Sequence, residues 1–149
     1  MIDKKLIFID LEAASKEEVI NALASEMITA GKARDTYLRA VLEREREYPT
    51  GLPLEGVNIA MPHTFAQHVI EPTIAVARLK QPVRFIQMGT KDQALEVQLV
   101  LMMAINDPQQ QLGMLKKIMR LFANSEVLKQ VMQSVTVEEL YQVLQCINE

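Results

Sequence analysis

The sequence has one cysteine, two histidines and no tryptophan in 149 residues, and its five glycines are dispersed. A single cysteine, Cys146, excludes an intramolecular disulfide and is typical of a reducing compartment. Dispersed glycines exclude a phosphate loop and a dinucleotide fingerprint, and no serine lies in a nucleophile-elbow sequence. Zinc ligation fails on the number of cysteines and histidines. We therefore expect neither a metal site nor a cofactor.

Strong charge imbalance and long apolar runs are also lacking. The 16 lysines and arginines are scattered among 19 acidic residues, the net charge is −3, and aromatic residues make up 5%. Nucleic-acid binding calls for a basic face or stacking aromatics, so no nucleic-acid partner is expected. The longest apolar stretch, Leu99 to Ile105, is too short to span a bilayer, and the N-terminus lacks a signal-peptide core. We expect a cytoplasmic protein that is not inserted in a membrane.

Local patterns predict one α/β domain over residues 1–149, a length that can bury a substantial core. Strands are expected at Lys5–Asp10, Val57–Met61, Ile74–Leu79, weakly Val83–Phe85, and Leu95–Ile105. Helices are expected between the Ser15 cap and Gly31, at Asp35–Glu47, from Asp107-Pro108 onward, at Glu126–Gln133 and at Val137–Cys146. The second half of the last strand is apolar on both faces, as in a central strand covered by helices on both sides. The fold class is a single-domain sandwich with a mostly mixed sheet and helices on both faces.

Two finer expectations concern the remaining segments. The segment Tyr48–Pro53 is rich in breakers and is predicted to be a loop. In the helix that Pro108 opens, helical spacing predicts these inward side chains: Leu112, Leu115, Ile118, Met119 and Phe122. Burial is also the expectation for Cys146 in the last helix.

His63 ends the run Ile59-Ala60-Met61-Pro62-His63, a short apolar strand that stops and presents an imidazole. Both protonation states of histidine are accessible near neutrality, so His63 is a candidate nucleophile or acid–base group. The alternative for an isolated histidine is a strand-end ring that only hydrogen-bonds to the backbone. Pro62 restricts the approach of the chain, and the Thr64 hydroxyl could orient the ring or bind an anion. His68 is expected to be an exposed loop residue.

A polar segment, Arg44 to Gly51, precedes this strand. Arg44 and Arg46 lie at the end of a predicted helix, where cations offset the helix dipole. Guanidinium geometry suits phosphate, so one of them could bind an anion, whereas Arg46 is better interpreted as a solvated charge.

The pattern Arg44-Glu45-x-x-x-Pro49-Thr50-Gly51, followed by Ile59-Ala60-Met61-Pro62-His63, closely resembles the signature of fructose/mannitol-type enzyme IIA domains of the bacterial sugar phosphotransferase system. The resemblance extends to Pro82-Val83-x-Phe85 and to Leu99–Leu115, and it covers essentially the whole chain. The run Pro108-Gln109-Gln110-Gln111-Leu112 resembles galactitol-type enzyme IIA proteins, which indicates a polyol rather than fructose.

The resemblance implies a phosphocarrier with the mannitol-type enzyme IIA fold. His63 would accept a phosphoryl group at Nε2 from the phosphohistidine of HPr and pass it to a cysteine of the cognate enzyme IIB, which works with the membrane subunit enzyme IIC. Arg44 matches the family's arginine near the active histidine, and Thr50 and Thr64 are candidate donors to phosphate. A phosphohistidine donor is already activated, so catalysis would consist mainly of positioning and charge stabilisation.

One residue departs from the family pattern. Mannitol- and fructose-type members carry a second active-site histidine where Gln111 stands here. Glutamine can donate a hydrogen bond to phosphate but cannot titrate. Without the resemblance, Gln110 and Gln111 would be interpreted as a solvated first helical turn.

Partner binding is predicted around His63. The expected apolar docking face consists of Phe65, Met61 and Leu52, and the expected charge complement to HPr consists of Glu45, Glu47 and Glu55. Two alternatives remain: a stand-alone regulatory, nitrogen-type enzyme IIA, and a non-catalytic anion-binding module on the same scaffold. The combination of His63, Arg44 and Thr50 argues against the second of these.

Overall fold

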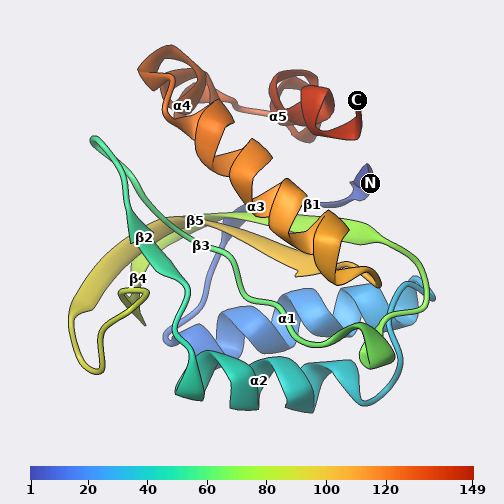
Figure 1. Ribbon diagram of the computed structural model, residues 1–149. Coiled ribbons are helices and arrows are strands. Elements are labelled where there is room, and N and C mark those ends of the chain that lie inside the picture. The colour runs from blue at the N-terminus through green and yellow to red at the C-terminus, as the bar shows by residue number, and fades with distance from the viewer.

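The computed structural model describes all 149 residues and contains one five-stranded sheet (Figure 1). Its strands are β1 (Ile2–Leu11), β2 (Gly51–Pro53), β3 (Asn58–Ala60), β4 (Thr73–Ile86) and β5 (Ala94–Ala104). They lie side by side in the order β1-β4-β5-β3-β2. The pairs β1–β4 and β3–β5 are parallel, whereas β4–β5 and β2–β3 are antiparallel. The predicted mixed sheet is confirmed.

Helices cover both faces of this sheet, as predicted. They are α1 (Lys16–Thr29), α2 (Tyr37–Glu47), α3 (Pro108–Phe122), α4 (Ser125–Gln133) and α5 (Val137–Leu144), with short 3₁₀ turns η1 (Ala66–His68) and η2 (Gln145–Asn148). Figure 1 shows α1 and α2 beneath the sheet and α3, α4 and α5 above it. None of these helices combines the length and apolar character that crossing a bilayer would require.

Alternating side chains of the central strands divide the core into two layers. Ala75 and Ala77 of β4 pack with the buried residues of α1 and α2. Ile74 and Val76, on the opposite face of the same strand, pack with those of α3, α4 and α5. This alternation follows from the two-residue period of a strand and explains why both faces of β4 and β5 are apolar.

The helix starts follow the capping residues in the sequence. Ser15 accepts a hydrogen bond from the Glu18 amide, and Asp107 caps α3 ahead of Pro108 in its first turn. The last predicted helix ends earlier than expected, because α5 stops at Leu144 and continues as η2. Cys146, in that 3₁₀ turn, is partly rather than fully buried.

Two strand predictions were wrong in detail. The segments predicted at 74–79 and 83–85 form the single strand β4, with a register shift between Arg78 and Val83 where Pro82 cannot donate to the ladder. The expected loop contains the strand β2, which starts at Gly51. A Cβ at Gly51 would lie 2.6 Å from the Ile86 carbonyl oxygen, so glycine here permits close backbone contact instead of breaking a strand.

The inward side of α3 is narrower than predicted. Ile118 and Phe122 are buried, but Leu112 and Met119 are 54% and 46% exposed. These two residues are seven positions apart, so they lie on one side of the helix. That side borders the cavity next to His63 instead of the sheet, and Leu112 lines this cavity.

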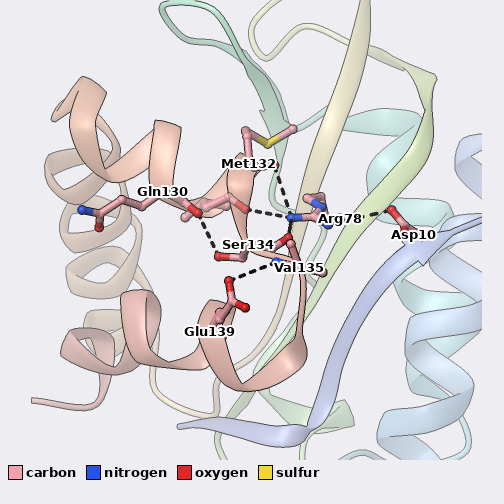
Figure 2. Close-up of polar contacts among 8 residues, drawn as sticks. Asp10, Arg78, Gln130, Met132, Ser134, Val135 and Glu139 are labelled. Carbon is pink, nitrogen blue, oxygen red and sulfur yellow. Dashed lines mark hydrogen bonds and ion pairs between the residues drawn. The ribbon is translucent and has the colours of Figure 1, made fainter.

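Arg78 is a buried charge that joins β4 to α4 (Figure 2). Only 9% exposed, its guanidinium donates from Nη1 to the carbonyls of Val131 at 3.1 Å, Met132 at 3.4 Å and Ser134. These carbonyls lie at the C-terminal end of α4, where the helix itself leaves acceptors unpaired. Asp10, at a positive φ of 58°, lies 3.8 Å from Nη2. Arg78 therefore closes the end of α4 and attaches it to the sheet.

Candidate active site

Three segments that are distant in the sequence build one cavity of about 280 Å³. Because β3 and β5 are parallel neighbours, the residues after each strand meet at the same edge of the sheet. His63 follows β3 and the start of α3 follows β5, while Arg44 comes from the last turn of α2. The cavity is lined by Arg44, His63, Thr64, Phe65, Ala66, Pro108, Gln111, Leu112 and Leu115. Of the residues predicted for the site, Thr50 is the one that does not line it.

The His63 ring has a defined tautomer. Its Nδ1 lies 2.7 Å from the carbonyl oxygen of Met61. A carbonyl oxygen can only accept, so Nδ1 carries the hydrogen and donates it. In the neutral ring the lone pair is then on Nε2, which makes Nε2 the nucleophilic atom.

Burial lowers the pKa of His63 below its ordinary value of 6.5, and the positive charge of Arg44 lowers it further. The hydrogen bond to the Met61 carbonyl opposes this shift by favouring the charged ring. The net effect is a ring that is neutral at pH 7, with its Nε2 lone pair available.

An NMR titration checks this expectation. The His63 resonances should titrate with a midpoint below 6.5, because the ring gains its second proton only as the pH falls through the lowered pKa. Comparison with His63→Gln assigns the signal. A midpoint at or above 6.5 would contradict the burial argument.

Arg44 is held by aromatic rings and not by a carboxylate. Its Cζ lies 4.1 Å from the centre of the Tyr48 ring and 5.0 Å from that of Phe65. Stacking on ring faces orients a guanidinium while leaving its N–H edge available. No ion pair within the chain involves Arg44, so its charge can serve an anion in the cavity.

Thr64 and Gln111 complete the polar lining. Thr64 is buried, while Gln111 is partly buried in the first turn of α3, and both line the cavity with His63. A hydroxyl and an amide can each donate a hydrogen bond to a bound anion. The interpretation of Gln111 as a fully solvated helical turn is not supported, whereas its neighbour Gln110 is exposed.

Thr50 lies behind the site. Its hydroxyl donates to Glu45 Oε1 at 2.7 Å and accepts from the Met61 amide at 3.1 Å. Because its hydroxyl hydrogen points to Glu45, Thr50 is not free to donate to a phosphate, as the sequence predicted it would.

Two residues predicted for the docking surface are buried. Glu45 is 2% exposed, since it follows Tyr37 and Val41 at intervals of four along the inner side of α2. Met61 is fully buried and packs on the α3–α5 side of the sheet. Their predicted surface roles are wrong, whereas Phe65 is 58% exposed and Leu52 is partly buried.

His68 lies in η1 and is half-buried, not fully exposed as predicted. Its Nδ1 is 2.8 Å from the Thr36 hydroxyl, and its carbonyl accepts from the Arg34 amide at 2.9 Å. These contacts attach η1 to the segment before α2. No group of three or more His, Cys, Asp or Glu side chains is placed to hold a metal ion.

Residues 1–146 match the family described as "Phosphoenolpyruvate-dependent sugar phosphotransferase system, EIIA 2". The chain belongs to this family. EIIA components carry phosphoryl groups in a relay, and this one is therefore a phosphotransferase of the sugar phosphotransferase system.

Relatives of this EIIA chain include separate and multidomain proteins. It is 37% identical over 101 residues to the galactitol-specific EIIA component of Escherichia coli K12, covering 68% of this chain and 67% of that protein. It is 27% identical over 146 residues to the fructose-specific EIIABC component of Bacillus subtilis, covering 97% of this chain and 22% of that protein.

Solved structures confirm the mannitol-type EIIA fold. The crystal structure of IIA mannitol from Escherichia coli has a TM-score of 0.79 at 23% identity, covering 97% of this chain and 99% of that one. The nitrogen regulatory protein IIA-Ntr of Neisseria meningitidis has a TM-score of 0.76 at 20% identity, covering 96% and 95%. At these identities the likeness concerns the fold alone.

Proposed function

We propose that His63 accepts a phosphoryl group at Nε2 from the phosphohistidine of HPr and passes it to a cysteine of a cognate enzyme IIB. The observation that carries this proposal is the 2.7 Å contact between Nδ1 and the Met61 carbonyl, which leaves Nε2 as the nucleophile in the cavity beside Arg44. We further propose that the chain is a single EIIA domain working in the cytoplasm, where phosphoenolpyruvate, named in the family description, is formed.

The transfer requires little of the protein beyond placement and charge. The Nε2 lone pair forms the new N–P bond while the N–P bond of the donor breaks, and the donor imidazole leaves with that electron pair. Neutral His63 has no proton on Nε2, so no general base is needed. As the ring becomes positive, the Met61 carbonyl that accepts from Nδ1 stabilises the charge.

The phosphoryl oxygens would be bound by the cavity lining. Arg44 offers a fixed positive charge, and Thr64 and Gln111 offer hydrogen-bond donors. Donors placed before the reaction are worth more than mobile ones because they need no reorganisation as charge moves. Gln111 would contribute a hydrogen bond without a second titrating ring beside His63.

The exposed apolar residues around the cavity suit transient partners. Phe65 and Leu112 line the cavity, and Met119 lies two turns further along the same side of α3. Small apolar patches with a polar rim are typical of short-lived complexes. A solved structure that shares this fold is a complex of enzyme IIA and phosphorylated enzyme IIB for mannitol. Glu47 and Glu55 are exposed and can form part of the rim.

The proposed transport substrate is a polyol such as galactitol. Its support is the 37% identity to a galactitol-specific EIIA component together with the glutamine run at the start of α3. The second candidate is a regulatory EIIA whose phosphorylation state signals to partner proteins, and the fold shared with IIA-Ntr favours keeping it.

A reconstituted relay tests the proposal. The chain is incubated with enzyme I, HPr and labelled phosphoenolpyruvate, and acid-labile phosphate is measured on the protein. A purified galactitol-type enzyme IIB is then added, and transfer of the label to its cysteine is expected. Failure to label the chain would overturn the phosphocarrier role. Labelling without onward transfer to this or another sugar-type enzyme IIB would favour the regulatory candidate.

Arg44→Ala is expected to slow phosphoryl acceptance by about a hundredfold, as loss of a placed charge donor does elsewhere. Single-turnover transfer from phospho-HPr measures the effect. Arg46→Ala is the matched control, because Arg46 lies on the same helix turn and is exposed. Equal rates for the two variants would remove Arg44 from the site.

A further inference from the structure

A continuous set of hydrogen bonds connects the interior of α2 to the His63 ring. The Glu45 carboxylate accepts from the Thr50 amide at 2.8 Å and from the Thr50 hydroxyl at 2.7 Å. The same hydroxyl accepts from the Met61 amide at 3.1 Å. Met61 in turn accepts the Nδ1 hydrogen of His63 through its carbonyl. The Thr50 hydroxyl is the central link of this set, since it donates its hydrogen to Glu45 and accepts at its oxygen from the Met61 amide.

We propose that Glu45 is a positioning residue for His63: through Thr50 it fixes the Met61 backbone, whose carbonyl holds the hydrogen on Nδ1 and keeps Nε2 free. The proposal rests on the function proposed above, because it explains how the nucleophile of that function is set. Glu45 does not line the cavity, and it acts only through Thr50 and Met61.

The direction of each hydrogen bond depends on a group at position 45 that only accepts. Thr50 presents two donors, its amide and its hydroxyl, and an ionised carboxylate can satisfy both. Once its hydrogen points to Glu45, the hydroxyl oxygen is free to accept from the Met61 amide. An amide or alcohol at position 45 would bring its own hydrogen and compete with one of these bonds.

The Met61–Pro62 segment is held from both sides. Thr50 binds the Met61 amide, and the Pro62 carbonyl accepts from the Met103 amide of β5 at 3.0 Å. With both contacts in place, the intervening Met61 carbonyl has one direction, toward the His63 ring. Loss of the Thr50 contact leaves a single attachment, and the carbonyl can then turn away from Nδ1.

The burial of Glu45 supports a specific role. Its neighbours on the inner side of α2 are Tyr37 and Val41, and no lysine or arginine forms an ion pair with it. Burial raises the pKa of Glu45 to about 7, against the two hydrogen bonds from Thr50 and the charge of Lys16, so the acceptor-only carboxylate predominates above that pH. An apolar residue would pack at this position without that desolvation cost.

The test measures the tautomer of His63 directly. Nitrogen-15 NMR of the ring at pH 8 distinguishes a hydrogen on Nδ1 from one on Nε2. The unaltered chain is expected to show the Nδ1–H form. In Glu45→Gln and Thr50→Val the Nε2–H form should become substantially populated, and single-turnover phosphoryl acceptance should fall by roughly tenfold to a hundredfold.

Two further variants separate positioning from general stability. Thr50→Ser keeps the hydroxyl and is expected to restore both the tautomer and the rate. Thr73→Val removes another buried hydroxyl, one that donates to the Met1 carbonyl at 3.1 Å and has no contact with His63. This variant should leave both readouts unchanged. Equal effects of Thr50→Val and Thr73→Val would assign Thr50 a merely structural role and overturn the proposal.

The readouts also separate this proposal from the proposed function. A normal tautomer and a normal rate in Glu45→Gln and Thr50→Val would overturn the positioning role while phosphoryl transfer stands. A shifted tautomer in a chain that never accepts phosphate would leave positioning intact and overturn the phosphocarrier role. Should the variants fail to fold, the unaltered chain decides, because a predominant Nε2–H form in it would by itself overturn the proposal.

Discussion

Replacing His63 with alanine is expected to abolish phosphoryl acceptance, with no acid-labile phosphate above background after incubation with enzyme I, HPr and phosphoenolpyruvate. Under the proposed mechanism the loss is complete, because the Nε2 lone pair forms the bond to phosphorus and no other side chain that lines the cavity can replace it. The cavity offers a guanidinium, a hydroxyl and an amide, but no second imidazole. Arg44, Thr64 and Gln111 would still bind an anion in this variant, so binding and chemistry can be separated.

The fold should tolerate the change. His63 is half-buried, and its one hydrogen bond within the chain is to the Met61 carbonyl. Loss of such a bond costs about 1 kcal/mol in the free energy of unfolding. His68→Ala is the matched control, since it removes the other histidine, which contacts Thr36 and does not line the cavity with His63. Phosphate on the His63→Ala chain, or its loss from His68→Ala alone, would move the acceptor to His68.

The parts of the fold that could be predicted are those with a strong period. Apolar residues on both faces of β5 indicated a central strand. Capping residues marked the helix starts because a cap acts within one turn of the chain. In each of these cases the signal and the structure it determines lie within a few residues.

The errors concern contacts between distant segments. Gly51 was interpreted as a breaker, but its missing side chain lets β2 approach Ile86. Leu112 and Met119 fit an inward helical pattern, but they face the open side next to the cavity, where no element covers them. Periodicity shows which residues share a side of a helix and does not show what lies against that side.

The candidate site also combines residues that local patterns could identify with contacts that such patterns could not. His63 and Thr64 meet Gln111 because β3 and β5 are parallel neighbours, and Arg44 joins them from the end of α2; no local pattern specifies either contact. The family resemblance supplied that information instead. The burial of Glu45 had a local signal that was missed: Tyr37, Val41 and Glu45 are spaced by four on one helix side.

Replacing Arg78 with methionine is expected to lower the free energy of unfolding by about 2–4 kcal/mol. Methionine fills much of the same volume, but it leaves unpaired the three carbonyls of Val131, Met132 and Ser134 that now accept from the guanidinium. Because these groups are at a buried helix end, water replaces the lost donor poorly. The ion pair with Asp10 adds little, since that carboxylate is mostly exposed.

Urea denaturation measures the change as a lower midpoint at an unchanged slope, which would indicate lost stability and not an altered unfolded state. Arg84→Met is the matched control on the same strand: its side chain is 73% exposed and 3.8 Å from Glu96, so its effect should stay within about 0.5 kcal/mol. Equal midpoints for the two variants would contradict the role of Arg78 at the end of α4.

Because α4 and α5 pack on the sheet through Val131 and Leu140, release of the α4 end should loosen this layer first. Hydrogen exchange in Arg78→Met is therefore expected to accelerate in α4 and α5 before it does in β3, leaving the His63 segment protected.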